Sequence, residues 1–156
     1  MKISITINKE IKKFEIHPSE LLIDVLRKNG YYGIKRGCME GDCGACIVII
    51  NDKIINACLF FAAKTDGQII TTIEGISSSG EVTDIQKSYI EAGAIQCGYC
   101  TPGFILATKV LLDNNCSPSD EEIKSGLESN LCRCTGYVKQ MDAVKSIVKN
   151  RLQSKK

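Results

Sequence analysis

Several residue types and patterns that mark common functional classes are scarce in this sequence. There is a single histidine, His17, so it has no second histidine with which to form a metal site and is expected at the surface. Acidic and basic residues are interspersed, and the net charge of +2 provides no basic face for nucleic acid. No apolar run approaches the length of a membrane span, and residues 1–5 are typical of a strand rather than a signal peptide. A cytoplasmic protein without nucleic-acid or membrane partners is therefore expected.

Cysteine, in contrast, is abundant, with nine residues in a chain of 156. The count is odd, and the thiols fall into short-spaced groups. In a reducing compartment these features favour metal ligation over disulfides.

The first group of thiols lies in a glycine-rich loop, residues 37–46, which contains Cys38, Cys43 and Cys46. Cys58 follows after a predicted apolar hairpin. The spacing C-x4-C-x2-C with a distant fourth cysteine is that of a plant-type [2Fe-2S] site. Glycine at Gly37, Gly41 and Gly44 lets backbone N–H groups approach the cluster sulfurs and so tune the reduction potential. A zinc site or buried free cysteines are the alternatives, although zinc sites usually pair two short knuckles. The loop predicts electron transfer.

The second group combines Cys97-x2-Cys100 with Cys132-x-Cys134. Each pair directly precedes a predicted helix, so the positive ends of two helix dipoles would face one anionic centre and lower the thiol pKa values. The spacing alone leaves zinc as an alternative.

The periodicity of the sequence changes near residue 76. Before it, alternation predicts strands at 3–7, 11–16, 47–50, 53–58 and 68–73. One helix crosses between them, with Ser19 as its N-cap and Gly30 at its end. This is the outline of a β-grasp, ferredoxin-like domain over residues 1–76.

After residue 76 the apolar period becomes helical. Helices are predicted at 83–93, 101–114, 119–127 and 138–148. Capping boxes at Thr83/Gln86 and Ser119/Glu122 open the first and third, and Thr101 is expected to cap the second. The fold class is thus α+β, with a small four-helix-bundle domain over 77–156 and a serine-rich linker at 76–80.

Three long motifs, covering almost the whole chain in order, resemble the iron–sulfur subunit of the xanthine oxidase family of molybdenum hydroxylases. They are Gly37-Cys38-x-x-Gly41-x-Cys43-Gly44-Ala45-Cys46, Gln96-Cys97-Gly98-Tyr99-Cys100-Thr101-Pro102-Gly103 and Asn130-Leu131-Cys132-Arg133-Cys134-Thr135-Gly136-Tyr137. The sequence departs from the family at Ser129, where glycine is frequent, and at Ile47, where threonine is common. Neither position is a ligand.

The resemblance implies two [2Fe-2S] clusters, an outer one near a flavin and an inner one near molybdopterin. The outer ligands would be Cys38, Cys43, Cys46 and Cys58, and the inner ligands Cys97, Cys100, Cys132 and Cys134. By the same resemblance Gln96 contacts the pterin and Cys134 is the electronic bridge to it. Without the resemblance, Gln96 would be a hydrogen-bonding residue at a helix end. Cys116 is left as a non-coordinating thiol.

The function that the resemblance implies is electron transfer within a multi-subunit oxidoreductase. Hydroxylation at molybdenum releases two electrons, and the two clusters pass them singly to FAD. No catalytic residue is expected on this chain, because it has no phosphate-binding glycine fingerprint and no evident acid/base pair. Molybdopterin and FAD are therefore assigned to large and medium partner subunits.

The substrate is expected to be xanthine or another purine, because residues 55–63 and 88–112 are most similar to bacterial xanthine dehydrogenase subunits. Aldehyde, nicotinate, carbon monoxide and aromatic acyl-CoA enzymes share the same small subunit and remain alternatives. A free-standing ferredoxin would need an acidic docking face, which the charge balance does not support. A structural zinc module would be colourless and free of acid-labile sulfide.

Overall fold

The alternating residues at the N-terminus form a hairpin, in a computed structural model that describes residues 1–77 and 80–153. Strands β1 (Lys2–Ile7) and β2 (Glu10–Glu15) pair antiparallel. The turn residues Asn8 and Lys9 have φ values of 50° and 73°, the backbone of a tight turn that matches the twist of the strands. The predicted hairpin is therefore confirmed.

The remaining strands complete a mixed sheet of order β2-β1-β5-β3-β4. Strand β5 (Ile69–Thr71) is parallel to β1 and antiparallel to β3 (Ile47–Ile50), which turns into β4 (Lys53–Asn56). Helix α1 (Leu22–Lys28) packs its buried face on the sheet. The observed strand β4 ends two residues before Cys58, which lies in a 3₁₀ turn, Ala57–Leu59. We call residues 1–76 the sheet half.

The second part of the chain, here the helical half, contains four helices in its described residues, 80–153. They are α2 (Asp84–Glu91), α3 (Thr101–Asn114), α4 (Asp120–Leu127) and α5 (Val138–Gln153). Both predicted capping boxes are present, at Thr83/Gln86 and at Ser119/Glu122. In the part of the chain that the structure describes, no helix is long and apolar enough to cross a membrane. The predicted α+β class is confirmed.

Two predicted caps are wrong. Helix α1 begins after Leu21, and Ser19 instead bonds the ring of His17 at 2.8 Å. The reason is tertiary, because Leu21 forms a bridge with Phe61 and holds the chain extended until that point. At α3 the N-cap position is Cys100, one residue earlier than predicted. Part of the predicted linker, residues 78 and 79, lies outside the described residues.

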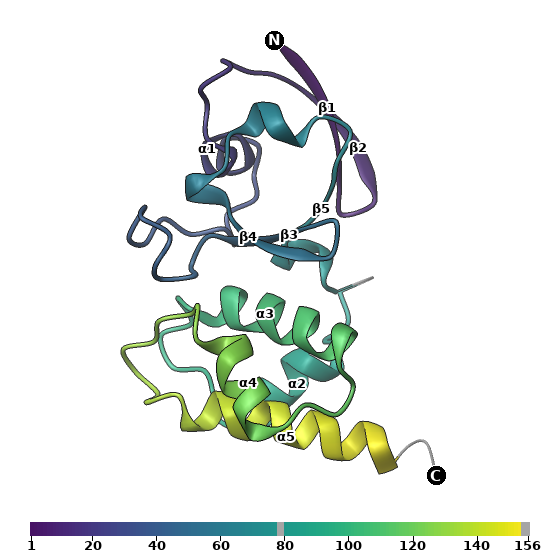
Figure 1. Ribbon diagram of the computed structural model, residues 1–156, viewed down its shortest axis with the longest axis vertical. Helices are drawn as coiled ribbons and strands as arrows, with labels where there is room; N and C mark the ends of the chain where they lie inside the picture. The colour runs from purple at the N-terminus through teal and green to yellow at the C-terminus, as the bar shows by residue number, and fades with distance from the viewer. Residues whose placement is uncertain (78–79, 154–156) are drawn as a thin grey trace.

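The two halves meet along a seam between α3 and the strands β3 and β4 (Figure 1). Buried side chains of Ile47, Ile49 and Leu106 fill the middle of the seam. At its end near the cysteines the backbones touch, since a Cβ added to Gly103 would lie 2.5 Å from the Gly44 carbonyl oxygen. Only glycine permits this approach. The seam therefore places the cysteine loop of the sheet half beside the start of α3.

Candidate metal centres

The first cysteine loop wraps its own sulfur atoms with backbone donors. The Cys38 sulfur accepts from the backbone N–H groups of Glu40 and Cys43, both at 3.4 Å, and the Cys43 sulfur accepts from the N–H of Cys38 at 3.3 Å. A Cβ at Gly37 would come within 2.5 Å of the Cys43 sulfur. These N–H groups stabilise negative charge on the sulfurs, as the sequence predicts.

The hairpin β3–β4 brings the remaining two thiols of this group together. Cys46 precedes β3, Cys58 follows β4, both are buried, and their sulfurs are 3.3 Å apart. Asn56, at the end of β4, supports the loop by donating to the Gly41 carbonyl at 2.9 Å. The antiparallel pairing thus carries Cys58 to the loop, as predicted.

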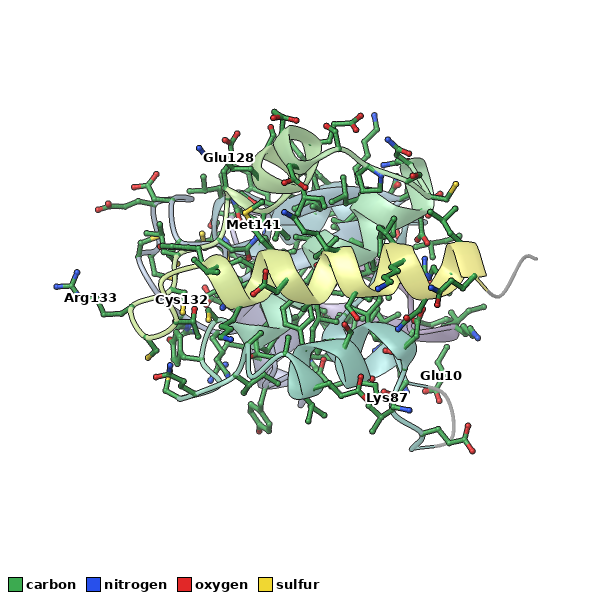
Figure 2. The ribbon with its side chains drawn as sticks, turned by 90° about the horizontal axis from the view of Figure 1, so that it is seen from below. Glu10, Lys87, Glu128, Cys132, Arg133 and Met141 are labelled. Carbon is green, nitrogen blue, oxygen red and sulfur yellow. The ribbon has the colours of Figure 1, made fainter. Side chains whose placement is uncertain are left out.

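The second cysteine group lines an open pocket of about 430 Å³. All four of its thiols lie there, and Cys97 and Cys134 are exposed. The loop that carries Cys132 is fixed by Tyr137, whose hydroxyl accepts from the Cys132 N–H at 3.1 Å. Thr135 bonds the Cys132 sulfur at 3.0 Å, and the buried Gln140 holds Thr135 in place at 2.7 Å. Figure 2 shows Cys132 on the loop that leads into α5.

In both groups the thiols meet as two pairs. Cys38 contacts Cys43 and Cys46 contacts Cys58 in the first group. In the second group, whose four thiols line one pocket, Cys97 and Cys134 shift each other's pKa, as do Cys100 and Cys132.

This paired arrangement is the donor set of a [2Fe-2S] cluster, in which each of two irons takes two thiolates. The residues present therefore fit a two-iron group at each position.

Each group contains a thiol whose pKa is lowered and a thiol whose pKa is raised. The backbone N–H of Glu40 lowers the pKa of Cys38 to about 7, whereas burial raises the pKa of Cys46 to about 12. In the second group burial raises the pKa of Cys100 to about 12. Burial raises the pKa of Cys132, but hydrogen bonds from the Thr135 hydroxyl, from the backbone N–H groups of Thr135 and Cys134 and from Cys100 together bring that pKa to about 7. Each group therefore has a thiol that ionises near neutral pH, and metal binding must release the protons of Cys46 and Cys100.

A direct hydrogen bond joins the two cysteine groups. The N–H of Leu131, the residue before Cys132, donates to the carbonyl oxygen of Cys43 at 3.0 Å. The residue before Leu131 is Asn130, which is 1% exposed and whose side-chain oxygen has no partner among the described residues. The path from the Cys43 sulfur to the Cys132 sulfur therefore runs through covalent bonds and one hydrogen bond.

Comparison with known proteins agrees with this geometry. A family model described as "2Fe-2S iron-sulfur cluster binding domain" matches residues 5–69, and one described as "[2Fe-2S] binding domain" matches residues 72–145. The fold and the two thiol groups thus define an iron–sulfur protein with two [2Fe-2S]-binding regions.

The relatives identify the family more closely. The nicotinate dehydrogenase small FeS subunit of Eubacterium barkeri is 45% identical over 94% of each chain. The xanthine dehydrogenase iron-sulfur-binding subunit of Escherichia coli O157:H7 is 42% identical over 80% of each chain. A chain of quinoline 2-oxidoreductase from Pseudomonas putida 86 superposes with a TM-score of 0.92 at 35% identity, over 98% of this chain and 96% of the other. The chain belongs to the iron–sulfur subunits of the xanthine oxidase family of molybdenum hydroxylases, and its function is electron transfer in a multi-subunit oxidoreductase with larger partner subunits.

The other residues that the sequence singles out are also placed. Gln96 is exposed beside the second group, and its amide donates to the Cys134 carbonyl at 3.3 Å. Cys116 is exposed and contributes to neither group. The residue that joins the groups, Leu131, is not evident from the sequence, because its role depends on a contact across the seam. A buried asparagine inside a cysteine motif is the one signal that could have indicated it.

Proposed function

We propose that the two thiol groups hold one [2Fe-2S] cluster each and that the chain conducts electrons between two partner subunits. The ligands of the first would be Cys38, Cys43, Cys46 and Cys58, and those of the second Cys97, Cys100, Cys132 and Cys134. Such clusters accept and release one electron at a time. The observation that carries the proposal is the Leu131 to Cys43 hydrogen bond at 3.0 Å, because it joins the groups by a short, fixed path.

This chain's own contribution is to position the thiolates, supply backbone donors to their sulfurs and hold the two groups at a constant separation. Backbone N–H groups at Cys38 and Cys43 stabilise negative charge at the first group. At the second group the hydroxyl of Thr135 bonds the Cys132 sulfur, and Tyr137 fixes the loop by accepting from the Cys132 N–H. The glycine contact between Gly44 and Gly103 keeps the seam closed. We also propose that the halves are separate domains with a boundary at 76/77 and that the protein is cytoplasmic, where its free thiols stay reduced.

The second group is the side on which we place the molybdopterin-binding large subunit. Its thiols Cys97 and Cys134 are exposed, and apolar side chains are exposed beside them at Tyr99, Leu131 and Tyr137. A surface of this composition is typical of a permanent interface. Gln96 and Cys134 would then face the pterin, and the exposed edge of the first group would face the FAD-binding medium subunit.

The substrate class that the relatives favour is a nitrogen-containing aromatic ring. Xanthine is our first candidate, from the similarity to a xanthine dehydrogenase subunit. Nicotinate is the second, and the 45% identity over 94% of each chain to a nicotinate dehydrogenase subunit supports it. The specificity is decided on a partner chain.

The proposal is tested in the native complex without oxygen. Xanthine, then nicotinate, is added, and the cluster absorbance and EPR spectrum are recorded before and after dithionite. We expect two [2Fe-2S] signals with dithionite and bleaching by one of the substrates. In Cys43→Ser the signal of the first group should disappear, while that of the second remains. Loss of both signals from a folded Cys43→Ser chain would contradict the two-group assignment.

A further inference from the structure

A lysine of the sheet half reaches into the cysteine loop of the helical half. The backbone N–H of Lys35 donates to the Ala45 carbonyl at 2.9 Å, which fixes this residue at the base of the first cysteine loop. Its ammonium group lies 3.5 Å from the carbonyl oxygen of Gly98 and 5.2 Å from the centre of the Tyr99 ring. Gly98 and Tyr99 are the two residues between Cys97 and Cys100. The ammonium group of Lys35 therefore lies beside the second cysteine group, although its backbone is part of the sheet half.

A reciprocal contact holds the lysine there. The hydroxyl of Tyr99 donates to the carbonyl oxygen of Arg36 at 2.6 Å, one residue beyond Lys35. The aromatic ring also attracts the ammonium group directly, by a cation–π interaction. Two contacts in opposite directions across the seam thus fix the position of the charge relative to the thiols.

The charge of Lys35 is not neutralised nearby. None of the carboxylates among residues 1–77 and 80–153 forms an ion pair with it. The neighbouring cations act elsewhere, since Arg36 pairs with Asp24 at 2.5 Å and Arg133 extends away from the body of the molecule (Figure 2). Lys35 is also only partly exposed, which limits screening by water.

We infer that Lys35 is a positioning residue that raises the reduction potential of the cluster bound by the second group. The inference rests on the proposed function, because it requires a cluster at Cys97 and Cys100. Reduction adds one electron and so one negative charge at that site, and a cation held against the loop between two of the ligands stabilises the reduced form more than the oxidised form. Lys35 thereby favours arrival of electrons at the second group.

The test is a potentiometric titration of the assembled complex, with both EPR signals recorded. The signal lost in Cys43→Ser identifies the first group, so the other belongs to the second. In Lys35→Gln, which keeps a hydrogen-bond donor but removes the charge, the equilibrium constant for reduction of the second cluster should fall roughly three- to tenfold. Tenfold corresponds to about 59 mV for one electron. The first cluster should shift less.

Two further variants complete the experiment. Lys35→Arg keeps the charge and should restore the potential. Lys109→Met removes a lysine from α3, beside the seam but away from the cysteines, where it pairs with Asp113 at 2.7 Å, and should change neither potential. Iron and sulfide contents are measured for every variant.

Each outcome decides a different point. Two intact signals with unchanged potentials in Lys35→Gln would overturn the role of Lys35 and leave the proposed function standing. Absence of two [2Fe-2S] signals in the wild-type complex would overturn the proposed function itself. If Lys35→Gln fails to load iron, the titration of Lys35→Arg decides, because a fall in its second potential would contradict an effect of charge.

Discussion

Replacing Gly103 with alanine tests whether the contact between backbones at the seam is needed. In an ordinary helix this change is favourable by about 0.8–1.0 kcal/mol. Here the new Cβ would lie 2.5 Å from the Gly44 carbonyl oxygen and 2.5 Å from the side-chain oxygen of Asn130. A backbone oxygen cannot rotate away, so the two halves must part by about half an ångström before the contact reaches 3.0 Å.

The expected loss of stability follows from these opposing terms. Overpacking of a closed site costs typically 1–3 kcal/mol, and we take the upper end because the obstacle is backbone. After the gain in helix propensity, Gly103→Ala should destabilise the chain by about 2 kcal/mol. For a chain of this size that lowers Tm by about 4–8 °C. The hydrogen bond from Leu131 to Cys43 should weaken as the seam opens.

The matched control is Gly126→Ala, in helix α4. Its Cβ would meet only the flexible side chain of Leu111, at 3.1 Å, so this variant should be as stable as the wild type or more stable. Thermal unfolding of the full, cluster-loaded chain gives Tm, and amide hydrogen exchange at Leu131 reports on the seam. A Gly103→Ala chain with unchanged Tm and a protected Leu131 amide would refute the reasoning.

Three further predictions concern other parts of the molecule. Cys116→Ser should leave iron and sulfide contents unchanged, and a fall in either would add Cys116 to the ligands. Thr108→Val leaves the buried hydroxyl of Tyr89 without its 2.8 Å partner and should destabilise the fold by about 1–3 kcal/mol; adding Tyr89→Phe should recover most of this, and an additive double mutant would contradict the coupling. Partial burial raises the pKa of the Asp84 carboxyl, but the ion pair with Arg151 lowers it further, to below 3.8. This exposed ion pair therefore stabilises the fold at pH 7, and its contribution is lost as the pH falls through the lowered pKa. At pH 7 Asp84→Asn should lower the free energy of unfolding by under about 1 kcal/mol, measured as a lower Tm than that of the wild type. The difference in Tm should vanish in acid, and a difference that persists there would exclude the ion pair as its cause.

The elements with strong local signals are the ones that the sequence predicts well. The capping boxes at Thr83 and Ser119 set the starts of α2 and α4, and each involves residues only three apart. Ser19 has the chemistry of a cap but fails as one, because pairing of Leu21 with Phe61 delays α1. A contact between residues forty positions apart has no local signature.

The same distinction applies to the site. Membership of the two cysteine groups could be predicted, from the spacings of the cysteines and from the resemblance to the family. The meeting of the thiols as pairs could not, since it depends on the loop geometry within each half. The bond from Leu131 to Cys43 and the reach of Lys35 to Gly98 could not either, since both depend on how the halves pack.

The glycine contact at the seam also has a consequence for recombination between relatives. Gly44 and Gly103 lie in different halves, and a side chain on either would meet the other half or its loop: one on Gly103 would meet the Gly44 carbonyl oxygen, and one on Gly44 would meet the Ser129 carbonyl oxygen and Asn130. A chimera that takes its sheet half from one relative and its helical half from another will assemble only if both parents keep the narrow backbone at these positions. The halves are therefore inherited as a matched set, although each has a hydrophobic core of its own.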